Sequence, residues 1–72
     1  MQYSETIPSD ELLRERLRLF AEQNGNDALW KRLEMIDPET ARRIHPNNVG
    51  RVIRAIEVME VSGRSIREHE GD

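Results

Sequence analysis

Residues 48–62 are the stretch that most restricts what this 72-residue chain can fold into. Apolar side chains recur there at the three- and four-residue intervals that mark one face of a helix. They are Val49, Val52, Ile53, Ile56 and Met59. Pro46 restricts His45 away from helical geometry. Asn47 is a suitable N-cap, and Gly63 is a suitable helix end. We therefore predict a helix over residues 48–62.

The opposite side of this predicted helix carries a second pattern. Arg51 and Arg54 stand there among Ala55 and Val58. Arginines set among small apolar residues are not typical of a helix face that only meets water. We therefore expect that side to contact something outside the chain, either further polypeptide or a ligand.

Three shorter helices are predicted before it. The first spans residues 10–24, with Ser9 as the N-cap and Gly25 as the end. One face of it is apolar and buried, with Leu13, Leu17, Phe20 and Ala21. The other face meets water, with Arg14, Arg18 and Glu22. The second runs from a cap at Asn26 or Asp27 to Ile36, on a stripe of Leu29, Leu33 and Ile36. The third covers residues 38–44, because Asp37-Pro38-Glu39 is a typical restart signal.

Trp30 admits two interpretations. An exposed indole could act as a platform on which a nucleic-acid base stacks, or the ring could anchor the core. Its helical spacing beside Leu33 favours the core.

The length bounds the architecture to one all-α domain, a small bundle of about four helices. No cysteine supplements the thin core of so short a chain, which fits a cytoplasmic protein. No apolar run approaches the roughly 20 residues that span a bilayer. We expect residues 1–8 to be an extended lead-in, 9–63 the helical domain and 64–72 a truncated tail, in which Ser65 caps a further helix. The whole is expected to be a piece of a larger protein.

Charge gives the first functional indication. The net charge of −3 argues against nucleic acid, but residues 41–56 contain four arginines and no acid. Arginine suits phosphate recognition, because its planar fork makes paired hydrogen bonds. The alternative is that these arginines bridge to acids on a neighbouring helix. Glu57 and Glu60 are expected to be ordinary surface carboxylates, with Glu60 paired to Arg64.

Catalytic signatures are absent from the sequence. It contains no glycine-rich phosphate loop, no HExxH and no nucleophile elbow. His45 and His69 lack companion ligands at metal spacing. We therefore predict no catalytic residue and no metal site within this chain.

Several of these residues together resemble a known signature. His45-Pro46-Asn47, Arg51, Arg54-Ala55, Glu57 and Gly63 resemble the motif of the tRNA dimethylallyltransferase family, as do Asp37-Pro38 and Ala41 upstream. The resemblance implies a helical insertion, excised from a larger P-loop α/β transferase, that grips the tRNA anticodon stem-loop. The parent enzyme would use Mg²⁺ and transfer a dimethylallyl group from dimethylallyl diphosphate to N6 of the adenosine 3′ of the anticodon. Its phosphate loop and catalytic residues would lie outside this chain.

The resemblance also assigns site residues. The family's tRNA-contacting segment falls on Gly50, Arg51, Val52, Ile53 and Arg54, with His45 and Asn47 as possible further contacts. Gly50 stands where the family usually has glutamine, and Asn48 where it has aspartate. Replacing either arginine by alanine is expected to weaken tRNA binding without lowering the melting temperature. The rival hypothesis is a helical protein-interaction module with no RNA role, whose face would be Ala55, Val58 and Val61.

Overall fold

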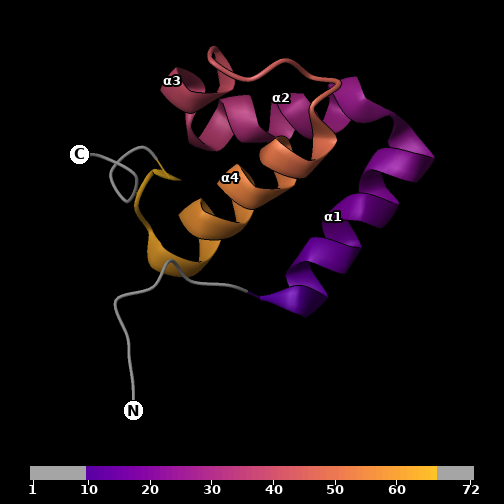
Figure 1. The fold of residues 1–72 in the computed structure, drawn as a ribbon, viewed down its shortest axis with the longest axis horizontal. Helices are drawn as coiled ribbons and strands as arrows, with labels where there is room; N and C mark the ends of the chain where they lie inside the picture. Colours follow the sequence, from indigo (N-terminus) through magenta and orange to yellow (C-terminus); the bar gives the residue numbers. More distant parts are fainter. Residues whose placement is uncertain (1–9, 67–72) are drawn as a thin grey trace.

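The structure is a computed structural model that describes residues 10–66. It contains four helices, α1 (Glu11–Asn24), α2 (Asn26–Ile36), α3 (Pro38–Ala41) and α4 (Val49–Ser62), and no strand within that range (Figure 1). The prediction of an all-α bundle of about four helices is confirmed. The predicted lead-in 1–8, the Ser9 cap and residues 67–72 of the predicted tail lie outside the described residues. No helix between residues 10 and 66 has the length and apolar character needed to cross a membrane.

Helix α1 begins one residue later than predicted. Asp10, and not Ser9 as predicted, is its N-cap, and the Asp10 carboxylate accepts a hydrogen bond from the Leu13 amide at 3.1 Å. Gly25 ends the helix as expected, with a φ of 98° that side chains rarely adopt. The same glycine is the N-cap of α2, so the prediction that Asn26 or Asp27 caps α2 is wrong.

Helix α2 packs against α1, α3 and α4, and its Leu29 and Leu33 are fully buried in the core. The Trp30 ring is partly buried against that core, and its Nε1–H is shared between the carbonyls of Ala41 at 2.9 Å and Ile44 at 2.8 Å. The prediction of a core anchor is therefore confirmed.

Helix α3 starts where the restart signal places it. The Asp37 carboxylate accepts from the Thr40 amide, and Pro38 occupies the first turn. The helix ends at Ala41, three residues earlier than predicted, and turns occupy residues 42–47. On its other carboxylate oxygen, Asp37 accepts from the buried Ser65 hydroxyl at 2.7 Å, so Ser65 joins the end of the described chain to α3.

Helix α4 lies against both α1 and α2 (Figure 1). For this reason the middle of α4, residues 52–58, is buried on most sides, and Ala55 and Val58 have no exposed surface. The prediction that these two residues face an absent partner is wrong. The face assigned to a protein-interaction module is therefore mostly interior, with only Val61 exposed. Gly63 ends α4 in left-handed geometry, as predicted.

Candidate nucleic-acid interface

Exposed polar and cationic side chains gather along the turn that joins α3 to α4 and on the first turn of α4. We call this set the α3–α4 surface. Its exposed members are Arg42, Arg43, His45, Asn47, Asn48, Gly50 and Arg51. No acidic residue occurs between positions 41 and 56. The surface therefore combines hydrogen-bond donors with local positive charge, which is the chemistry that phosphate groups attract.

The turn itself is held by short-range hydrogen bonds. The His45 Nδ1 accepts from the Asn47 amide at 3.0 Å, and the His45 carbonyl accepts from the Asn48 amide at 2.9 Å. Asn48, and not Asn47 as predicted, is the N-cap of α4, and its side chain makes no capping hydrogen bond. The N-terminus of α4 therefore carries no side-chain cap. The positive end of the helix dipole lies at the exposed turn.

The predicted tRNA-contacting segment, residues 50–54, is divided by the fold into an outer and an inner part. Gly50 and Arg51 are exposed, and a Cβ placed at Gly50 would meet no atom within 4 Å. Val52 and Ile53 are buried in the core, at 0% and 3% exposure. Their side chains can position the segment but cannot contact a ligand at the surface.

Arg54 differs from Arg51 although it lies only one helical turn away. Its side chain is 31% exposed, and its Nη1 donates to Glu57 Oε1 at 2.7 Å. The alternative weighed for these arginines, a bridge to a carboxylate, therefore describes Arg54. The bridge is made within α4 itself and not to a neighbouring helix.

Glu57 is the residue that sequence reasoning placed wrongly. It was expected at the surface, but its side chain is fully buried. Besides the Arg54 contact, Glu57 Oε2 accepts from the Asp10 backbone amide and lies 3.3 Å from Arg14 Nε. Arg14, which was expected to face water, thus pairs with a buried carboxylate. One signal could have identified the site: Glu57 lies between Ile56 and Val58 in the most apolar part of α4, residues 52–58, where Arg54 is the only other charged residue.

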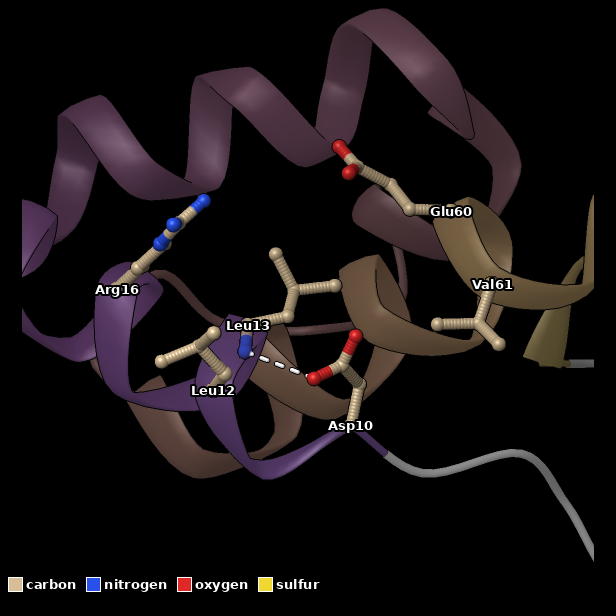
Figure 2. A pocket seen from close by; sticks show the side chains of 6 residues that line it. All are labelled: Asp10, Leu12, Leu13, Arg16, Glu60 and Val61. Carbon is tan, nitrogen blue, oxygen red and sulfur yellow. Dashed lines mark hydrogen bonds between the residues drawn. The ribbon is translucent and has the colours of Figure 1, made fainter.

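Glu60 was expected to pair with Arg64, and the structure instead places its carboxylate 3.7 Å from Arg32 on α2. It also lines an open hollow between the start of α1 and the end of α4 (Figure 2). The lining residues are Asp10, Leu12, Leu13, Arg16, Glu60 and Val61. This hollow carries two carboxylates for one arginine, so it is a poor receptor for phosphate compared with the α3–α4 surface.

The described part of the chain holds no group of three His, Cys, Asp or Glu side chains that could bind a metal ion. Neither His45 nor any carboxylate within residues 10–66 belongs to such a group. The chemistry that the α3–α4 surface supports is therefore recognition of an anion by donors and positive charge.

Comparison with known proteins supplies the family. The profile described as IPP transferase matches residues 1–72. The tRNA dimethylallyltransferase of Geobacillus thermodenitrificans is 52% identical over 61 residues, which are 85% of this chain and 19% of the relative. That of Desulforamulus reducens is 48% identical over 65 residues (90% and 23%), and that of an Exiguobacterium species is 59% identical over 51 residues (71% and 16%). The chain thus spans about a fifth of the length of these relatives. With a family profile that covers its whole length, this chain belongs to the IPP transferase family.

Proposed function

We propose that this chain is a tRNA-binding segment of a tRNA dimethylallyltransferase, and that the α3–α4 surface contacts the anticodon stem-loop. The parent enzyme would transfer a dimethylallyl group from dimethylallyl diphosphate to N6 of the adenosine 3′ of the anticodon. The observation that carries the proposal is the exposed Arg51, in an acid-free stretch at the start of α4, in a family whose named relatives act on tRNA.

The physical basis is recognition of the RNA backbone. RNA loops are bound through phosphate and 2′-hydroxyl contacts together with splayed, unstacked bases. The Arg51 guanidinium would make charge-assisted hydrogen bonds to phosphate. The uncapped N-terminus of α4 favours the same anion through its dipole, and the missing side chain at Gly50 lets a backbone approach closely.

The other residues of the predicted site either add polar contacts to RNA or hold the segment in place. His45 and Asn47 are exposed beside the α4 N-terminus and offer further polar contacts. Val52 and Ile53 fix the segment to the core. The half-buried Arg54 would contribute charge while its hydrogen bond to Glu57 is kept.

The reactive chemistry belongs to the parent enzyme in this proposal. Mg²⁺ and dimethylallyl diphosphate would be bound by polypeptide outside this chain, where the family resemblance places the phosphate loop. The target adenine must leave its stack for chemistry at N6, and a firm grip on the surrounding stem-loop would support that step. A cytoplasmic location is proposed on the same basis, since that is where an enzyme of this kind would meet its tRNA.

The test is a titration of the 72-residue chain with an anticodon stem-loop RNA, followed by amide chemical shifts. We expect the shifts to cluster at residues 45–54. Arg51→Ala should weaken binding roughly two- to fivefold and reduce the salt dependence of log Kd by roughly one unit, with the melting temperature unchanged. Arg18→Ala, which removes an exposed arginine from α1, is the matched control. Equal effects of the two variants, or shifts spread evenly over the chain, would contradict the proposal.

A further inference from the structure

Arg43 has chemistry that the predicted site does not use. It is exposed, and its guanidinium makes no hydrogen bond or ion pair with any residue in the described range. Its neighbour Arg42 pairs with Glu39 at 3.3 Å, so the charge of Arg42 is partly compensated. Arg43 is therefore an uncompensated cation on the turn that precedes α4.

The position of Arg43 is fixed by the residues around it. Its backbone amide donates to the Thr40 carbonyl at 3.0 Å, and the next amide, that of Ile44, donates to the Ala41 carbonyl at 3.2 Å. The Ile44 side chain is buried in the core, whereas Arg43 and His45 on either side of it are exposed. The turn thus presents these two side chains to solvent from a backbone that is anchored on the inside.

Trp30 provides that anchor from a different helix. Its single indole N–H is shared between the Ala41 and Ile44 carbonyls, and these two residues flank Arg42 and Arg43 in the chain. The indole adds a donor from another helix to carbonyls at and just beyond the end of α3, which stabilises the chain direction there. The Trp30 indole therefore holds the turn in one shape before any ligand arrives.

We propose that Arg43 is an additional phosphate-binding residue of the α3–α4 surface and that Trp30 is a positioning residue which acts through the turn. The inference rests on the proposed function, because the ligand is the backbone of the same RNA. A preformed turn loses less conformational freedom on binding than a loose one, which is how a residue that never touches RNA can raise affinity. With Arg43, the phosphate contacts reach from the first turn of α4 across this surface to the end of α3.

The test is a double-mutant cycle measured as Kd for an anticodon stem-loop RNA, with the 72-residue chain. Arg43→Ala should weaken binding roughly two- to fivefold and lower the salt slope by roughly one unit. Trp30→Phe keeps an aromatic ring but removes the N–H, and it should weaken binding by a similar factor. The two effects should not multiply in the double variant, because Trp30 acts through the placement of Arg43. A purely structural role of Trp30 would lower the melting temperature without this coupling.

Each outcome has a stated meaning. If Arg43→Ala matches the Arg18→Ala control while Arg51→Ala still weakens binding, this inference is overturned and the proposed function stands. If Arg51→Ala and Arg43→Ala both match the control, the proposed function and this inference are both overturned. Should Trp30→Phe fail to fold, hydrogen exchange of the Trp30 indole N–H in the unmutated chain decides the positioning role. Slow exchange supports it, and exchange as fast as in a free indole overturns it.

Discussion

The first turn and the middle of α4 place charged side chains in opposite environments. The first turn presents Gly50 and Arg51 to solvent beside an acid-free turn. In the middle of the helix, Glu57 is fully buried and accepts from Arg54 and from the Asp10 backbone amide, with Arg14 beside it. The difference comes from what packs against each of these two parts. The carboxylate is covered by the start of α1, whereas the first turn of α4 follows an exposed loop.

This comparison separates two arginines that a sequence motif treats alike. Arg51 and Arg54 are three residues apart, but the Arg51 side chain is exposed, whereas Arg54 donates to the buried Glu57 carboxylate. Loss of Arg54 would leave the fully buried Glu57 carboxylate with one partner fewer, and a buried charge that loses a partner destabilises the fold. We therefore expect Arg54→Ala mainly to lower the unfolding free energy and Arg51→Ala mainly to lower RNA affinity.

The largest effect is expected at Glu57, in the buried middle of α4. Glu57→Gln preserves the shape but removes the charge, and it turns an amide donor toward the Asp10 N–H or the two guanidinium groups. We expect the free energy of unfolding to fall by roughly 2–4 kcal/mol, as for other buried pairs that lose one partner. In a domain of this size that corresponds to a melting temperature lower by about 10 °C or more, measurable by circular dichroism.

The control for Glu57 lies three residues further along the helix. Glu60 is exposed and its carboxylate is 3.7 Å from Arg32, so Glu60→Gln should change the unfolding free energy by less than about 1 kcal/mol. Similar melting temperatures for the two variants would show that the burial of Glu57 does not persist in solution, and would remove the contrast between the first turn and the middle of α4.

Much of the fold could be predicted from local sequence. The Gly25 and Gly63 ends, the Asp37-Pro38 start of α3 and the Leu29–Leu33 stripe are set by residues close together in the chain, and each was placed correctly. What local sequence could not give was which helices pack on both sides of α4. That is why Ala55 and Val58 were assigned to an outer face.

The candidate site shows the same limit. The exposed positions of His45, Asn47 and Arg51 follow from the helix boundary at Pro46. The contact between Glu57 and Asp10 spans 47 positions, and no local pattern reports it. The Trp30 hydrogen bonds to the turn could not be predicted either. The spacing beside Leu33 predicts that the ring is buried, but it does not identify the partner of the indole N–H.

Arg54→Ala is the next test of the comparison, with a smaller expected effect. Glu57 would keep the Asp10 amide and Arg14, so we expect a loss of about 1–2 kcal/mol in unfolding free energy. RNA affinity, measured well below the melting temperature, should fall less than it does for Arg51→Ala. A loss of affinity in Arg54→Ala equal to that of Arg51→Ala, with an unchanged melting temperature, would assign Arg54 to the RNA surface and contradict this division.

The smallest effects are expected from glycines at the two ends of α4, and they should have opposite signs. Gly50 lies within the first turn with open space around its Cα, so Gly50→Ala should raise the unfolding free energy by about 0.5 kcal/mol through helix propensity. Gly63 has a φ of 76°, where a side chain is strained, so Gly63→Ala should lower it by about 1 kcal/mol. Because neither substitution adds a clash, thermal melts of the pair isolate the backbone term. If Gly50→Ala reduces RNA affinity while it raises stability, the missing side chain at position 50 serves the close approach of RNA. The glycine at the first turn of α4 would then lower the stability of the helix and raise its affinity for RNA.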